Sequence, residues 1–219
     1  MSVQSVGHET FRSVIGVIDY RAGNAPSVGY ALERLGVDYR LVANGDELSR
    51  CDRIILPGVG AAAATIDSLK SAGLLEPLTK SVRDEKTPIL GICVGLQILL
   101  EHSEEGDVAG LGWIPGNVKQ FTGPLRVPQI GWNSVKVVRP HPLVEGFPDA
   151  GYCYFVNSYF ATPSNPDHVI ATTSYGEDFC SIMAHENIVA TQFHAEKSGE
   201  IGLSLLTNFS TWNPESMSS

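Results

Sequence analysis

Charged residues are scarce in this sequence, and long apolar runs are absent from it. Of the 219 residues, 18% are charged and 43% are hydrophobic, whereas about 25% charge is usual in a soluble protein. Such a composition excludes an intrinsically disordered chain and predicts a large buried core. No apolar stretch approaches the roughly 18 residues of a membrane-spanning helix, and residues 1–11 lack the pattern of a signal peptide. We therefore expect a cytoplasmic protein without a membrane partner.

Basic residues are also in the minority. Lys and Arg together number 15 against 24 Asp and Glu, which gives a net charge of −9 at pH 7 and an isoelectric point near 5.1. A surface with this excess of negative charge repels phosphate backbones and anionic lipids. Nucleic acid is therefore excluded as the main partner, and a small molecule or another protein remains.

Cysteine is sparse, and its spacing excludes two classes of protein. The four cysteines lie far apart without a C-x-x-C pair, which suits neither a disulfide scaffold nor a thiolate zinc site. We expect four free thiols, one of which is a candidate nucleophile. Histidines at ligand spacing are lacking too, so we expect no metal and no cofactor. The histidines interpreted as structural or surface residues are His8, His102, His141, His168 and His185.

What the sequence does contain is an alternation of strands and helices. Short β-branched runs predict buried strands, and apolar residues at helical spacing predict amphipathic helices. In the first half, strands are predicted at 13–19, 39–42, 53–56 and 88–92, and helices at 25–35, from 61 onward, and at 94–102. Residues 113–159 read instead as short strands broken by glycine and proline, as in antiparallel hairpins.

The remainder of the chain completes this fold. Strands are predicted at 169–173, 179–184 and 188–193, and a closing helix at 198–211 with Ser198 as its N-cap and Leu203, Leu206 and Phe209 turned inward. The pattern predicts an α/β fold, a three-layer α/β/α domain with a mostly parallel central sheet and a β-rich insert. We expect a polar leader at 1–12 and a single domain at 13–212.

A cysteine stands between two glycines where a predicted strand passes into a predicted helix. Residues 91–95 read G-I-C-V-G, the G-x-nucleophile-x-G form of a sharp strand-to-helix turn. A thiol at the start of a helix lies near the positive end of the helix dipole, which favours the thiolate. The N–H of Val94 would face an oxyanion formed at Cys93. A core cysteine between glycines that serve only packing is the alternative.

A base and a group to orient it follow another predicted strand. Residues 192–196 read Q-F-H-A-E. If this segment continues the strand, His194 and Glu196 project to the same side, so that the carboxylate reaches one imidazole nitrogen while the other faces the thiol. A solvated loop pair is the alternative. Because the carboxyl ends of parallel strands converge on one edge of a sheet, the order Cys, His, Glu favours a catalytic site.

Two further features lie near these turns. Residues 57–60 read P-G-V-G before a helix, a turn able to direct a backbone N–H at a carbonyl oxygen. This turn lacks the pattern of a phosphate loop and of a dinucleotide site, so we interpret it as part of an oxyanion hole. Gln97, four residues after Cys93 on the same helix face, is suited to bind a small polar substrate, with a buried polar residue as the alternative.

The three turns together resemble the class I glutamine amidotransferase family. Its nucleophile motif is close to G-I-C-L-G-x-Q, and its histidine motif is close to Q-F-H-P-E. Similar segments in this chain are I-D-Y and A-G-N at 18–24, L-P-G-V-G-A at 56–61, V-P and G-W-N at 127–133, Y-F-V and S-Y at 154–159, and Q-F-H-A-E-K-S at 192–198. The similarity runs from about residue 14 to residue 209.

The resemblance implies a flavodoxin-like fold and a glutaminase that acts on L-glutamine. By the same resemblance Cys93, His194 and Glu196 form the catalytic triad. The implied oxyanion hole consists of Gly58, Val59, Gly60 and Val94. The implied glutamine-binding groups are Gln97 and the backbone of Ser158 and Tyr159.

A partner is implied as well. In the branch of the family that these segments resemble, the glutaminase is one subunit of a heterodimer and passes ammonia to a (β/α)8-barrel cyclase subunit. The residues implied at that interface are Asn24, Trp132, Tyr154 and Lys197. Exposed Trp and Tyr suit the core of an interface, and buried packing is the alternative.

Several positions depart from the family pattern. Ala195 stands where the family usually has proline, so the fixed φ of that link is lost and we expect a looser pair of His194 and Glu196. The other departures are Arg21, Val94, Gln129 and Asn157. Two alternatives remain. One is an amidotransferase subunit that serves another synthase, and the other, suggested by Ala195 and the altered segments, is a glutamine-binding regulatory subunit without catalysis.

Overall fold

Five parallel strands form the centre of the protein. The computed structural model describes residues 13–21 and 23–217. The strands lie in the order β2-β1-β3-β4-β13. Their bounds are β1 Ile15–Ile18, β2 Tyr39–Val42, β3 Arg53–Gly58, β4 Ile89–Cys93 and β13 Ile188–Thr191. Every residue of β1, β4 and β13 is buried, as expected of strands covered on both faces.

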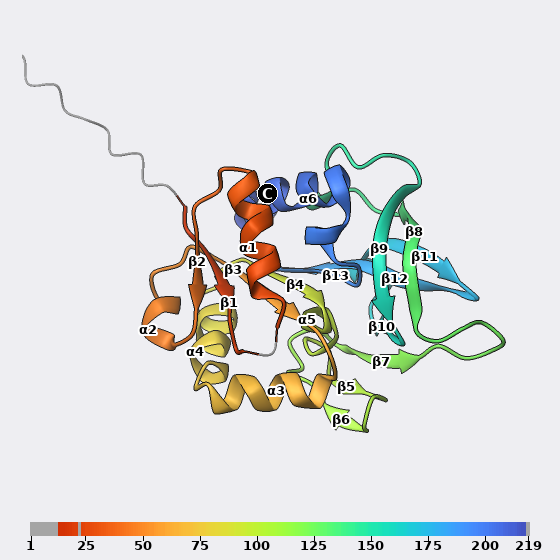
Figure 1. Ribbon diagram of the computed structural model, residues 1–219, viewed down its shortest axis with the longest axis horizontal. Coiled ribbons are helices and arrows are strands. Elements are labelled where there is room, and N and C mark those ends of the chain that lie inside the picture. The colour runs from red at the N-terminus through yellow and green to blue at the C-terminus, as the bar shows by residue number, and fades with distance from the viewer. Residues whose placement is uncertain (1–12, 22, 218–219) are drawn as a thin grey trace, which may run out of the picture.

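Helices cover both faces of this parallel core (Figure 1). One face carries α1 (Ala25–Arg34) and α6 (Gly199–Thr211), and the other carries α3 (Ala62–Ser71), α4 (Leu75–Thr79) and α5 (Val94–Gln97). A short helix, α2 (Gly45–Leu48), follows β2, and a π-helical segment at Lys80–Asp84 continues α4. Short 3-10 helices lie at Pro142–Val144, Pro166–His168, Ala195–Lys197 and Pro214–Met217. The predicted three-layer arrangement is confirmed.

The β-rich insert extends the sheet in largely antiparallel fashion. From β13 the order continues β12-β10-β7-β5-β6, while β11 pairs with β12 and β8, and β8 pairs with β9. The bounds are β5 His102–Ser103, β6 Val108–Ala109, β7 Gly116–Gln120, β8 Gln129–Val137, β9 Gly151–Asn157, β10 Tyr159–Pro163, β11 Val169–Tyr175 and β12 Glu177–His185. The strands predicted in the second half of the chain are therefore confirmed. Strand β13 joins the two parts of the sheet, because it is parallel to β4 and antiparallel to β12.

One predicted helix is wrong in length. The helix expected at 94–102 ends at Gln97, and His102 begins β5. The backbone amides after Gln97 leave the helical pattern. Those of Leu99 and Leu100 donate to carbonyl oxygens only three residues back, and the Glu101 amide donates to the Gly116 carbonyl oxygen on β7 at 2.9 Å.

The closing helix begins where the sequence predicts, but its cap is different. Ser198 occupies the N-cap position of α6 without a side-chain bond to the helix. Its hydroxyl instead donates to the His194 carbonyl oxygen at 2.6 Å and accepts from the Tyr154 N–H at 3.0 Å. Ser198 therefore joins β9 to the turn that carries the predicted base. The apolar face of α6 is buried as expected, with Leu203, Leu206 and Phe209 at most 8% exposed.

The expectations about the chain as a whole have different outcomes. The predicted leader at 1–12 lies outside the described residues. All four cysteines are free thiols. Within the described ranges, no helix is long and apolar enough to cross a membrane.

Candidate active site

Cys93 lies on a strained turn between β4 and α5. Its φ of 56° and ψ of −109° are unusual for a residue with a side chain. The turn depends on close approach of neighbouring backbones. A Cβ at Gly95 would lie 2.0 Å from the Leu56 carbonyl oxygen, and one at Gly58 would lie 2.5 Å from the Gly95 nitrogen. Only glycine fits both positions, and the predicted nucleophile turn is present.

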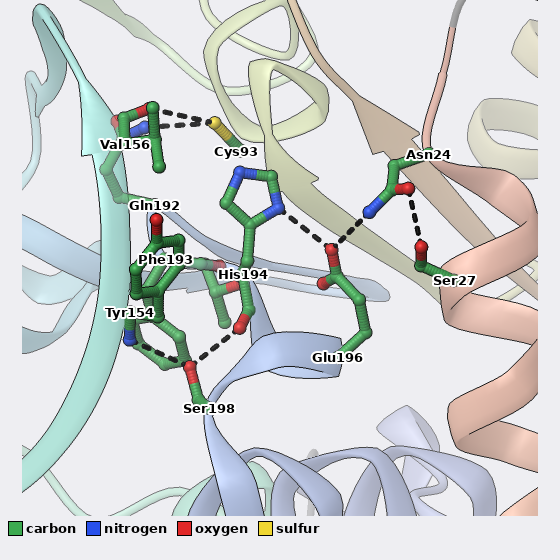
Figure 2. Close-up of polar contacts among 11 residues, drawn as sticks. Asn24, Ser27, Cys93, Tyr154, Val156, Gln192, Phe193, His194, Glu196 and Ser198 are labelled. Atoms are coloured by element: carbon green, nitrogen blue, oxygen red, sulfur yellow. Dashed lines mark hydrogen bonds and ion pairs between the residues drawn. The ribbon is translucent and has the colours of Figure 1, made fainter. Parts of the chain in front are cut away.

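The surroundings of the Cys93 sulfur come from the strand β9 and from the end of β13. The sulfur lies 3.8 Å from the Val156 carbonyl oxygen and 3.9 Å from the Gln192 Nε2 (Figure 2). The exposed fraction of Cys93 is 4%. Gln192 belongs to the motif that led to His194, but sequence reasoning gave it no role of its own.

His194 and Glu196 form a buried pair. Nδ1 of His194 lies 2.9 Å from Oε1 of Glu196, and their side chains are 5% and 0% exposed. Figure 2 shows the imidazole between this carboxylate and the sulfur of Cys93. The solvated loop pair considered from sequence is therefore wrong.

The backbone route to this pair differs from the expectation. His194 and Glu196 do not continue the strand, because β13 ends at Thr191 and a 3-10 helix spans Ala195–Lys197. The expected loosening at Ala195 is not seen either. The Lys197 N–H donates to the His194 carbonyl oxygen and the Ser198 N–H to that of Ala195, both at 3.1 Å. These hydrogen bonds fix the turn without the ring of a proline.

The pKa values of His194 and of two buried cysteines are shifted from their usual values. Burial alone lowers the pKa of His194, but its hydrogen bonds with Cys93 and Glu196, together with their charges, outweigh this and raise that pKa from 6.5 to about 10. Burial raises the pKa of Cys153 and of Cys180 to about 12. The imidazolium form is thus favoured beside Cys93, whereas Cys153 and Cys180 stay neutral thiols.

The carboxylate of Glu196 has a partner that sequence reasoning did not assign to it. Nδ2 of Asn24 donates to Oε1 of Glu196 at 2.8 Å, across 172 residues of sequence. Asn24 was expected at a partner interface, and its side chain points at Glu196 (Figure 2). No local pattern marks this contact, because it depends on how α1 packs beside the 3-10 turn.

The predicted oxyanion-hole residues surround the start of α5. Val94 is the first residue of α5, and the N–H groups of a first helical turn have no acceptor within the helix. Pro57 and Val59 both contact the Tyr20 hydroxyl, which donates to the Pro57 carbonyl oxygen at 2.9 Å and hydrogen-bonds the Val59 backbone. Gly60 has a φ of 86°. Tyr20 is therefore a further residue of this region that sequence reasoning missed.

The predicted glutamine-binding residues are linked by amide hydrogen bonds. Gln97 is 4% exposed, and its Nε2 donates to the Tyr159 carbonyl oxygen at 3.0 Å and to Oε1 of Gln192 at 3.3 Å. Nδ2 of Asn157 also donates to the Tyr159 carbonyl oxygen, at 3.0 Å. The Ser158 carbonyl oxygen accepts from Phe121. Gln97 thus holds the backbone of the Ser158 and Tyr159 segment.

The remaining predicted residues lie on the paired strands β8 and β9 and on the turn after His194. Trp132 on β8 is 56% exposed and packs edge-on against Tyr154 on β9, with ring centroids 6.0 Å apart. Lys197 is exposed on the turn after His194. Ile130 and Tyr152, which sequence reasoning missed, belong to the same face at 59% and 58% exposure. Buried packing of Trp132 is therefore excluded.

This arrangement has the parts of a nucleophilic acyl-transfer site. A cysteine on a strained turn adjoins an imidazole, and a buried carboxylate orients that imidazole. Val94 begins α5 directly after this cysteine, and Gly58 of the turn at 57–60 pairs with Cys93 across β3 and β4. Among the described residues, no group of three or more His, Cys, Asp or Glu is arranged to hold a metal.

Comparison with known proteins agrees with this geometry. The model of the family "Glutamine amidotransferase class-I" matches residues 16–211. The chain is 47% identical over 197 residues to the imidazole glycerol phosphate synthase subunit HisH of Methanocaldococcus jannaschii, covering 90% of this chain and 98% of that protein. It is 44% identical to HisH of Dehalococcoides mccartyi, covering 90% and 96%. A solved glutamine amidotransferase structure has the same fold, with a TM-score of 0.70 at 20% identity, covering 90% and 99%. The chain belongs to the class I glutamine amidotransferase family and is similar to its HisH members.

Proposed function

We propose that this chain is the glutaminase subunit of imidazole glycerol phosphate synthase. It hydrolyses L-glutamine to glutamate and ammonia within one domain at residues 13–212, and it delivers the ammonia to the HisF cyclase subunit in L-histidine biosynthesis. The observation that carries the proposal is the strained Cys93 turn beside the buried pair of His194 and Glu196, joined at 2.9 Å. The similarity to HisH proteins along 90% of the chain supports the choice of synthase.

The triad supplies the covalent chemistry. The thiolate of Cys93 attacks the side-chain amide carbon of glutamine, and the carbonyl oxygen takes the negative charge. His194, as imidazolium, gives its proton to the amide nitrogen, so the C–N bond breaks and ammonia leaves a glutamyl thioester. Water then loses a proton to His194 and attacks the thioester, which releases glutamate and restores the thiolate. Glu196 orients and charge-stabilises the imidazolium through Nδ1.

The backbone around the sulfur stabilises the oxyanion and binds the substrate. The Val94 N–H and the turn of Gly58, Val59 and Gly60 are proposed to donate to the oxyanion. The backbone of Ser158 and Tyr159 holds the glutamine. Gln97 supports that backbone, since its Nε2 donates to the Tyr159 carbonyl oxygen at 3.0 Å.

The partner is proposed to dock on the outer face of the β8–β9 hairpin. Ile130, Trp132 and Tyr152 on that face are each more than half exposed, which is typical of an unoccupied interface core. The same hairpin contributes the Val156 carbonyl oxygen at 3.8 Å from Cys93. A subunit seated there lies beside the point where ammonia forms. HisF would then use the ammonia to convert a phosphoribulosyl formimino nucleotide into imidazole glycerol phosphate and an aminoimidazole carboxamide ribotide.

Glutamate production tests the proposal. The wild type, Cys93→Ala and the matched control Cys51→Ala are assayed alone and with HisF of the same organism plus its nucleotide ligand. Strong stimulation by HisF that is lost in Cys93→Ala and kept in Cys51→Ala is the expected result. Turnover that depends on Cys93 but ignores HisF would assign the chain to another synthase. Silence in every assay would favour a glutamine-binding subunit without catalysis.

A further inference from the structure

The carboxylate of Glu196 is buried and has few partners. Its side chain is fully inaccessible, and its Oε2 has no hydrogen-bond partner among the residues that the structure describes. Oε1 receives two contacts, one with Nδ1 of His194 at 2.9 Å and one from Nδ2 of Asn24 at 2.8 Å. A buried carboxylate depends on its hydrogen bonds to remain charged. Asn24 supplies half of those that the structure gives to Glu196.

The orientation of the Asn24 amide is set by a second contact. Ser27, one turn into α1, donates its hydroxyl to Oδ1 of Asn24 at 2.7 Å (Figure 2). Because Oδ1 accepts from Ser27, the NH2 group must face Glu196, where a donor is needed. Ser27 therefore donates to Asn24, and Asn24 donates to Glu196. The carboxylate of Glu196 contacts His194 with the same oxygen.

Asn24 does not do what an asparagine at its position ordinarily does. It is the N-cap residue of α1, and N-cap asparagines usually accept a backbone N–H from the first helical turn with their side chain. The Asn24 side chain makes no such cap bond. Asn44, the N-cap residue of α2, makes it in the usual way, with Oδ1 accepting from the Glu47 N–H at 3.0 Å. The amide of Asn24 thus serves the triad in place of its own helix.

We propose that Asn24 is a positioning residue for the glutaminase reaction, which holds the Glu196 carboxylate directed at Nδ1 of His194. The inference rests on the proposed function of the triad. Asn24 touches no reacting atom and acts through Glu196. By this contact the turn between β1 and α1 is coupled to the imidazole on the opposite side of the carboxylate.

Replacement of Asn24 tests the proposal in the complex with HisF. In Asn24→Ala the carboxylate keeps only the imidazole, and kcat for glutamate production falls about 10- to 100-fold, the range for a lost hydrogen bond to a charged group. KM for glutamine stays within about twofold, because Asn24 does not contact the substrate. Asn24→Asp brings a second carboxylate beside Glu196, so the pair retains a proton more readily and the acid limb of the kcat profile moves to higher pH.

Two further variants separate positioning from a general effect on folding. Ser27→Ala leaves Asn24 in place but frees its amide, so its loss of kcat has the same direction and a smaller size. Asn44→Ala removes a helix cap far from the triad, so it lowers thermal stability and leaves both kcat and the pH profile as in the wild type. HisF is kept saturating, and its Kd is measured for each variant.

The outcomes are distinct for the two proposals. Wild-type kcat and an unmoved pH profile in both Asn24 variants, with Cys93→Ala inactive, would overturn the role of Asn24 and leave the glutaminase proposal intact. A uniform loss of kcat with an unchanged pH profile in Asn24→Asp would also overturn it, because a merely structural contact acts in that way. Activity that persists in Cys93→Ala would instead overturn the proposed function itself.

Discussion

The carbonyl oxygen of Val156 lies 3.8 Å from the sulfur of Cys93. Val156 belongs to β9, whose outer face carries Tyr152 and Tyr154 and pairs with Trp132 on β8. One strand therefore covers the nucleophile on one side and forms the proposed docking surface for HisF with its side chains. Contact with the partner and access to the sulfur are coupled through the position of a single backbone.

We expect alkylation of Cys93 to depend on the partner. Cys93 is 4% exposed, so iodoacetamide should label it slowly in the free chain. Binding of HisF with its nucleotide should increase the labelling rate of Cys93. Peptide mass spectrometry checks this, with the half-buried Cys51 as the internal control whose rate stays constant. Equal Cys93 rates with and without HisF would contradict the coupling.

The ionisation of His194 should depend on Cys93. The pKa of His194 is raised to about 10, with the Cys93 hydrogen bond as the first of the causes that raise it. Removal of the thiol in Cys93→Ala should lower this pKa. Burial lowers the pKa of His194, and only Glu196 would then remain to raise it. Titration of ring resonances by NMR measures it, with His194→Gln identifying the signal. An unchanged pKa in Cys93→Ala would show that Glu196 alone determines it.

The same shift predicts how stability changes with pH. The folded pKa of His194 lies above the ordinary 6.5, so protonated His194 stabilises the fold fully below about pH 6.5. The stabilisation is lost as the pH rises towards about 10. Urea unfolding from pH 6 to 10 should therefore show a steeper decline in the free energy of unfolding for the wild type than for His194→Gln. Parallel curves would contradict this prediction.

Truncation of Trp132 should weaken binding of HisF. The side chain is 56% exposed on β8 and packs edge-on against Tyr154. Loss of a central interface tryptophan commonly costs about 2 kcal/mol or more, so the Kd for HisF should rise about 30-fold in Trp132→Ala. The control is Leu41→Ala, a 42% exposed residue on β2 at the opposite edge of the sheet. Equal Kd values for the two variants would assign the interface elsewhere.

Proline should be accepted at position 195. His194, with φ −81° and ψ 99°, lies outside the helical region that a following proline disfavours, and Ala195 opens a 3-10 helix. We expect Ala195→Pro to retain glutaminase activity. It should raise the free energy of unfolding by about 0.4–1 kcal/mol, because proline reduces the conformational entropy of the unfolded chain. Thermal and urea unfolding measure this. Ala31→Pro, inside α1, is the matched control and should destabilise by about 3 kcal/mol or more.

The sequence predicts those parts of the site that depend on local backbone geometry. Glycines around Cys93, with a strand before it and a helix after it, are enough to predict the sharp turn, and the order of the motifs brings His194 to the same edge of the sheet. The helix predicted at 94–102 is too long because its apolar spacing does not reveal that the Glu101 amide pairs with the Gly116 carbonyl oxygen on β7. Side-chain periodicity predicts which face of an element is buried. It does not predict backbone hydrogen bonds between segments that are distant in the sequence.

Contacts between distant segments lie beyond sequence reasoning for the same reason. Asn24 and Glu196 are 172 residues apart, and nothing near either residue predicts their hydrogen bond. Ser198 matches an N-cap pattern, yet its hydroxyl links His194 and Tyr154. In both cases a polar residue at a helix start had a local role available, and tertiary packing supplied a stronger partner.

The place of β13 in the sheet has a consequence for how the protein is made. This strand lies between β4 and β12, yet it is the last strand along the chain, and His194 and Glu196 follow it. On the ribosome, the gap in the middle of the sheet stays open until the final portion of the chain has emerged. The proposed nucleophile, Cys93, is therefore synthesised about a hundred residues before its proposed base, His194. On this proposal the nascent chain cannot release ammonia before translation is almost complete.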